Sequence, residues 1–127
     1  MNDRTLYWLE IAEYDLETAR AMLETGRYLY VGFMCHQVIE KGFKAAIASR
    51  GDNTPYIHNL SRLAEKAGLY EQLSPEQKDF IDALEPLNVQ ARYPDEKKEL
   101  AAAMTPGGCE TMLTQTRDLF QWIRATL

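Results

Sequence analysis

The stretch from residue 28 to residue 49 carries apolar side chains on two faces of a predicted helix. The first stripe comprises Val31, Met34, Cys35, Val38, Ile39, Gly42, Ala45 and Ala46, and the second comprises Phe33, Phe43 and Ile47. A helix that is apolar on two sides has to be covered by other elements on both of them. This segment therefore predicts a fold built around a central, buried helix.

The balance of apolar residues favours helices in the rest of the chain as well. The sequence contains 15 Leu and 14 Ala but only 3 Val and 6 Ile. Leu and Ala lose little side-chain freedom in a helix, whereas β-branched residues lose more. A chain of 127 residues can build one hydrophobic core but not two independent ones. We therefore predict a single all-α domain over residues 1–127.

Helical periodicity and local stop signals predict where the other helices lie. The expected features are a helix over residues 4–25 capped by Gly26, a short helix from Asn59 or Ser61 to about Ala67, a helix that begins after Ser74 and is ended or kinked at Pro86, a helix-competent segment over residues 96–104, and a last helix after a break at residues 105–108. Because the connections are brief, we predict an antiparallel up-and-down bundle of four main helices plus one short helix.

Charge is distributed unevenly along the chain. The net charge is −5, which disfavours a protein that binds nucleic acid through its overall field. Residues 1–26 carry two basic and six acidic side chains, whereas residues 27–50 carry four basic and one acidic. Either the two predicted helices attract each other as neighbours, or the basic one faces an anionic ligand.

Several classes of protein lack support in the sequence. No apolar run approaches the ~20 residues that a membrane span requires, and the N-terminus lacks the apolar segment of a signal peptide. We therefore expect a cytoplasmic protein with no membrane association. Cys35 and Cys109 show no metal-ligand spacing, and no nucleotide-loop or hydrolase motif is present. We expect no cofactor and no metal.

The densest group of polar side chains lies on the predicted central helix. His36, Glu40 and Lys44 are four residues apart, so they share one face, and Lys41 lies beside them. This line is either a solvated strip or part of a ligand site. Because His58 enters the next short helix, we predict that His36, Glu40 and His58 converge on one side of the central helix.

Three motifs in a fixed order resemble the HEPN (higher eukaryotes and prokaryotes nucleotide-binding) domain family. They are His36-Gln37-x-x-Glu40-Lys41-x-x-Lys44-Ala45, His58-x-Leu60-x-x-Leu63 and Arg92-Tyr93-Pro94-Asp95. Trp8 and Ala12-x-x-Asp15-Leu16-x-x-Ala19 resemble the family's first helix. The resemblance covers about residues 5–125 and implies a helical bundle that is commonly dimeric and often has a minimal nucleotidyltransferase as its partner, in a two-component or toxin-antitoxin-like system.

The resemblance also implies a ligand-binding cleft for a nucleotide-like anion. The candidate ligand-binding residues are His36, Glu40, Lys41, Lys44, His58, Arg92 and Tyr93. We expect Lys44 to be exposed, so that its removal weakens binding of a phosphate-bearing ligand at little cost in stability. If removal of Lys44 instead destabilises the fold by several kcal/mol and affects no ligand, Lys44 belongs to a buried structural pair with Glu40, and an interaction module is favoured over a nucleotide site.

One departure from the family bears on catalysis. Family members that act as metal-independent ribonucleases carry an Arg followed four to six residues later by a His, and neither His36 nor His58 is preceded by Arg at that spacing. We therefore predict a non-catalytic domain. One alternative is a divergent ribonuclease in which His36 or His58 supplies the base and Arg92 stabilises the phosphate, acting on RNA. The other alternative is an interaction module without a small-molecule ligand.

The aromatic residues suggest how the chain assembles. Among 13 aromatic residues, five lie at the edges of the predicted apolar stripes, where an interface uses amphipathic rings. They are Tyr7, Tyr14, Tyr28, Tyr30 and Trp122. We predict a homodimer.

Overall fold

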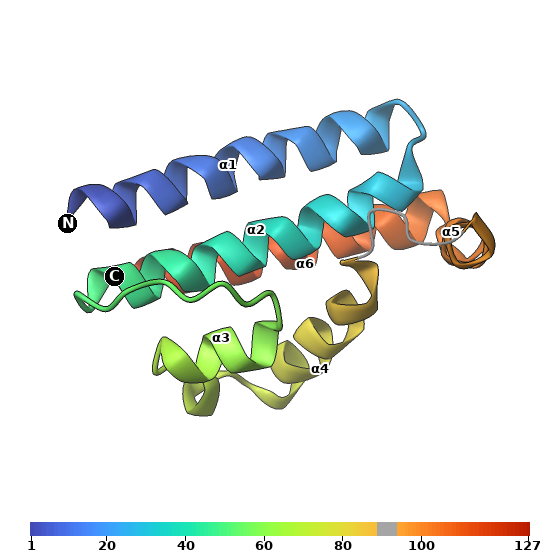
Figure 1. Ribbon diagram of the computed structural model, residues 1–127. Coiled ribbons are helices and arrows are strands. Elements are labelled where there is room, and N and C mark those ends of the chain that lie inside the picture. Colours follow the sequence, from blue (N-terminus) through green and yellow to red (C-terminus); the bar gives the residue numbers. More distant parts are fainter. Residues whose placement is uncertain (89–93) are drawn as a thin grey trace.

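The structure, a computed structural model, describes residues 1–88 and 94–127. Within them the chain forms six α-helices and two short 3-10 helices (Figure 1). These are α1 (Asp3–Glu24), α2 (Tyr28–Ser49), α3 (Leu60–Lys66), η1 (Tyr70–Gln72), α4 (Pro75–Leu84), η2 (Glu85–Leu87), α5 (Pro94–Ala103) and α6 (Pro106–Ala125). The predicted all-α bundle is confirmed. No helix in the described ranges has the length and apolar content needed to cross a membrane.

Local capping signals explain most of the helix boundaries. Asn59, one of the two predicted caps, accepts a hydrogen bond from the backbone N–H of Arg62 at the start of α3. Ser74 and Gln77 form a reciprocal capping box at the start of α4. Gly26 follows the C-cap of α1 with a φ of +76°, a backbone conformation that glycine adopts without strain.

The predicted break at residues 105–108 is wrong for most of its length. The last helix already begins at Pro106, and the side chain of Thr105 accepts a hydrogen bond from the N–H of Gly108. Proline is pre-organised for the first position of a helix, and a threonine cap supplies an acceptor for an unpaired N–H. The two glycines therefore lie in the first turn of α6. The segment after Pro94, predicted only as helix-competent, forms α5 as an additional short helix.

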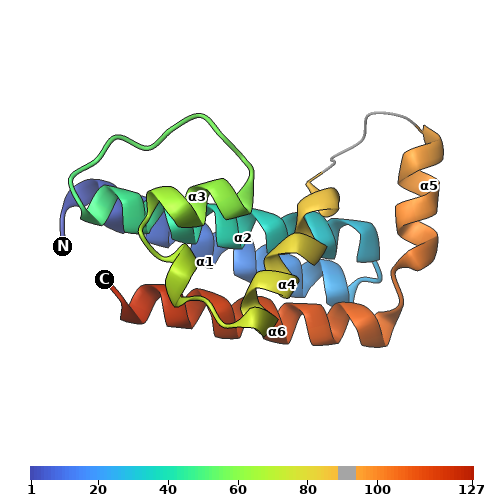
Figure 2. The ribbon, with the colours of Figure 1, turned by 90° about the horizontal axis from the view of Figure 1, so that it is seen from below.

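Three long helices form the body of the bundle, with α2 packed against both α1 and α6. The predicted antiparallel pairing holds for α1 with α2 and for α1 with α6, where Glu13 pairs with Arg124 near the end of α6. In contrast, α2 and α6 run in the same direction, since Cys109 lies beside Tyr28 and Phe120 lies beside Gly42. Between the end of α2 and the start of α6, the helices α3, α4 and α5 lead back to the other end of the bundle (Figures 1 and 2).

Burial around α2 agrees with its two apolar stripes. Fourteen of its 22 residues are buried, and α3 and α4 also pack against it. At Gly42 a Cβ atom would lie 3.3 Å from Cδ1 of Phe120 and 3.4 Å from Cδ1 of Ile123, so the missing side chain lets α6 approach closely. The polar residues of α2 are thereby held inside a packed structure rather than on an open surface.

Candidate functional site

Glu40, in the middle of α2, is the centre of a polar cluster that also contains His36, Lys44 and His58. Its carboxylate is only 2% exposed. One oxygen accepts a hydrogen bond from Nζ of Lys44 at 3.1 Å, and the other lies 3.1 Å from Nδ1 of His58. Because an ionised carboxylate can only accept, Nδ1 of His58 is the donor. We call these four residues the Glu40 cluster.

His36 is the most deeply buried member of the cluster, with no exposed surface. Its Nδ1 is 3.8 Å from Oε1 of Glu40, and its Nε2 is 3.7 Å from Oε2 of Glu85. Neither ring nitrogen has a hydrogen-bond partner among the described residues. Desolvation by burial lowers the pKa of His36, although the Coulombic attraction of Glu85 and Glu40 opposes that shift. The predicted convergence of His36, Glu40 and His58 is confirmed, and His36 supports the cluster from inside.

The expectation that Lys44 is exposed is wrong. The residue is only 6% exposed, and its ammonium group lies 5.4 Å from the centroid of the Trp8 ring. Trp8 reaches it from α1, which packs along α2. A buried lysine keeps its charge when a carboxylate and an aromatic face replace the lost water. Lys44 therefore belongs to a buried pair with Glu40.

Lys41 takes part in a different contact. Its Nζ lies 3.1 Å from Oδ2 of Asp15 on α1 and 2.6 Å from Oε1 of Gln37. This contact is a specific instance of the predicted attraction between the acidic first helix and the basic second helix. We call Asp15, Gln37 and Lys41 the α1–α2 seam. Lys41 therefore lies outside the Glu40 cluster.

A pocket of about 390 Å³ adjoins the Glu40 cluster where the N-terminal part of α1 meets the loop after α2. Its lining residues are Arg4, Tyr7, Trp8, Lys44, Asn53, Thr54, Pro55 and Tyr56. Nη1 of Arg4 donates a hydrogen bond to Oδ1 of Asn53 across 3.2 Å, and the Tyr7 and Trp8 rings meet edge to face at 5.3 Å. We call this cavity the Arg4 pocket. It combines two cationic groups with three aromatic side chains.

Arg4 and Tyr56 were not among the predicted site residues. They are 52 positions apart in the sequence, and only the packing of α1 beside α2 brings them to one cavity. A weak signal was present, because Tyr56 follows Pro55 in a polar loop where an aromatic ring has little local reason to occur.

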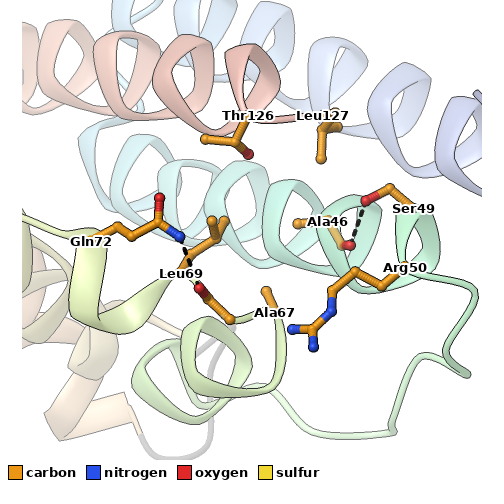
Figure 3. A pocket seen from close by; sticks show the side chains of 9 residues that line it. Ala46, Ser49, Arg50, Ala67, Leu69, Gln72, Thr126 and Leu127 are labelled. Atoms are coloured by element: carbon orange, nitrogen blue, oxygen red, sulfur yellow. Dashed lines mark hydrogen bonds between the residues drawn. The ribbon is translucent and has the colours of Figure 1, made fainter.

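A second cavity, of about 320 Å³, lies at the C-terminal end of α2 (Figure 3). Arg50 extends along its wall and donates to the Lys66 carbonyl at 3.2 Å. Its Nε also lies 3.9 Å from Oδ2 of Asp52. None of the described residues that line it is aromatic. Its arginine is already engaged by acceptors of the chain itself.

Comparison with known proteins identifies the family. A sequence model described as the HEPN domain matches residues 5–126. The chain belongs to the HEPN domain family. None of the curated proteins matches the sequence.

Two solved structures share the fold of this HEPN domain. The protein TT1696 from Thermus thermophilus superposes with a TM-score of 0.85 at 21% identity, over 99% of this chain and 100% of that one. ST0689, an archaeal HEPN homologue, superposes with a TM-score of 0.68 at 20% identity, over 98% of each chain. At these identities the likeness establishes the fold of the domain.

The remaining candidate residues of the HEPN domain are Arg92 and Tyr93, which lie outside the described residues. Within residues 1–88 and 94–127, His, Cys, Asp and Glu side chains do not gather in a group of three or more that could hold a metal ion.

Proposed function

We propose that this HEPN domain is a binding domain for a nucleotide-like anion and that the Arg4 pocket holds the ligand. The observation that carries the proposal is the lining of the pocket, where Arg4 and Lys44 lie with Tyr7, Trp8 and Tyr56 around one cavity. Cationic groups attract phosphate, and flat rings stack on nucleobases. An anion with an aromatic group satisfies both features at once.

The two cations contribute differently to this proposal. Lys44 is paired with the buried carboxylate of Glu40, so much of its charge is already compensated. Arg4 donates to the neutral side chain of Asn53, and a guanidinium has five N–H donors in a planar fork. Arg4 is therefore the main phosphate-binding residue. Lys44, which is buried in the wall of the pocket, adds positive potential.

Calorimetry with nucleotides on the full chain tests the proposal. Arg4→Gln should weaken binding about tenfold, which corresponds to ~1.4 kcal/mol, and added salt should weaken binding to the unaltered protein. Arg20→Gln is the matched control, because Arg20 is an exposed arginine of the same helix that does not line the pocket. If no nucleotide binds, or if both variants bind like the unaltered protein, the proposal fails.

A second candidate, a metal-independent ribonuclease, is favoured by the geometry of His58. The side chain is 63% exposed, and Glu40 accepts from its Nδ1. In a neutral imidazole, a donor at Nδ1 leaves Nε2 as the acceptor, which is the form that a general base needs. Labelled RNA incubated with the protein without metal tests this candidate. Cleavage that His58→Ala abolishes would replace the binding proposal, whereas intact RNA removes the candidate.

We also propose that the domain assembles as a homodimer. Tyr7 and Tyr14 are 57% and 71% exposed and lie seven residues apart on α1, hence on the same face. Tyr28 and Trp122 pack against the core instead. Light scattering at tens of micromolar protein checks this assembly, and a monomer would contradict it. A minimal nucleotidyltransferase partner stays a prediction of the family resemblance, which a neighbouring reading frame of that kind would support.

A further inference from the structure

We infer that the Arg4 pocket is built for a single nucleoside monophosphate, in preference to a nucleoside triphosphate or an RNA strand. This inference rests on the proposed function, because it specifies the ligand of the same pocket. Three features carry it: the charge of the lining, the net charge of the chain, and the exposure of the aromatic rings.

The charge of the lining matches one phosphate group. Arg4 and Lys44 are the charged residues among those that line the pocket. Glu40, 3.1 Å from Nζ of Lys44, contributes one negative charge directly behind it. Two positive charges and one negative charge leave a local net charge of +1. A monophosphate carries a charge close to −2 at neutral pH, whereas a triphosphate would bring about twice that into a site with one uncompensated cation.

The charge of the whole chain also bears on the size of the ligand. The net charge is −5, which disfavours binding of a long polyanion. Phosphate groups beyond the first therefore gain no attraction from the overall field of the protein.

The aromatic residues offer a surface for one base. Tyr56 is fully exposed at the pocket, and Tyr7 is partly exposed. The Trp8 ring is already contacted by Lys44 and by the edge of Tyr7. Tyr56 is thus the ring best placed to stack on an incoming base. A volume of about 390 Å³ is near the lower end of the range for small-molecule pockets, ~300 to 1,000 Å³.

Calorimetry with a defined ligand series tests this inference on the full chain. The probes are the four 5′-ribonucleoside monophosphates, ATP, adenosine, inorganic phosphate and a short single-stranded RNA. We expect at least one monophosphate to bind about tenfold more tightly than ATP, adenosine, phosphate or the RNA. Tighter binding of ATP or of RNA overturns the inference and leaves the proposed function standing, whereas binding of none of the nucleotides overturns both.

Two substitutions separate the roles of ring and charge. Tyr56→Ala should weaken binding of the preferred monophosphate about tenfold and leave inorganic phosphate binding unchanged, whereas Leu6→Ala, at an exposed apolar residue of α1 that does not line the pocket, should change neither. Arg4→Gln should weaken binding of both the monophosphate and inorganic phosphate. Equal weakening of monophosphate binding in the Tyr56 and Leu6 variants, or unchanged phosphate binding in the Arg4 variant, contradicts the inference.

Discussion

The Glu40 cluster and the α1–α2 seam arise from the same helix and from the same kinds of residue, yet their surroundings differ. Lys44 and Lys41 are three positions apart on α2, and each has a carboxylate partner at 3.1 Å. The Lys44–Glu40 pair is buried, and the ring of Trp8 lies beside Lys44. The Lys41–Asp15 pair keeps more contact with water, with side chains that are 17% and 12% exposed.

The effect of breaking a Lys–carboxylate pair on stability depends on how deeply the pair is buried. In the interior, each charge has lost most of its water, so removing one partner leaves the other uncompensated. Where the side chains keep more contact with water, water replaces part of the lost interaction, so the cost is smaller. The Glu40 cluster should therefore respond strongly to substitution and weakly to salt, and the seam should show the opposite behaviour.

The largest effect is expected from Glu40→Ala. This substitution leaves the buried ammonium of Lys44 without its carboxylate and removes the acceptor for Nδ1 of His58. Breaking a buried pair in this way costs about 3–5 kcal/mol of unfolding free energy, which urea denaturation measures. A loss below about 1 kcal/mol would mean that Lys44 reaches water, and the contrast between the two regions would disappear.

A smaller effect is expected from pH, because burial lowers the pKa of His36. As the pH falls below about 6.5, the unfolded chain takes up a proton at His36 before the folded protein does. The stability contributed by the neutral ring is therefore present above this pH and is lost as the pH falls, by at most about 1.4 kcal/mol per pH unit.

Comparison with His36→Gln isolates this contribution from the titration of the carboxylates. Urea denaturation of both proteins between pH 7 and pH 5 should show a shallower decrease in stability for the variant. An equal decrease in the two proteins would show that folding leaves the pKa of His36 unchanged, and a steeper decrease in the variant would show that Glu40 and Glu85 hold the ring protonated.

The smallest effect is expected from Lys41→Ala. Its contact with Asp15 is buried less deeply than the Lys44–Glu40 pair, so the loss should be smaller, about 1 kcal/mol. A double-mutant cycle with Asp15→Asn measures the coupling between the two side chains, and it should decrease in high salt. A coupling that exceeds about 2 kcal/mol and does not change with salt would place the seam in the same class as the Glu40 cluster.

Features that depend on near neighbours in the chain could be predicted from the sequence alone. The helix caps at Asn59 and Ser74 were predictable because they satisfy N–H groups only three residues away. The helical repeat predicted that His36, Glu40 and Lys44 share one face of α2. The order of the motifs predicted that His58 lies close to that face. Two-sided burial of α2 was visible in its apolar stripes because each stripe requires a covering element.

Contacts between segments that are distant in the sequence could not be predicted and are known only from the tertiary structure. The parallel course of α2 and α6, the burial of Lys44 beside Trp8 and the pairing of Arg4 with the loop at Asn53 join residues between 36 and 81 positions apart. Local patterns do not encode such distances, because a polar side chain at helical spacing is equally compatible with solvent and with a covered interface. Packing determines which charges lose their water, and with that loss it determines which of them support the fold and which line the Arg4 pocket.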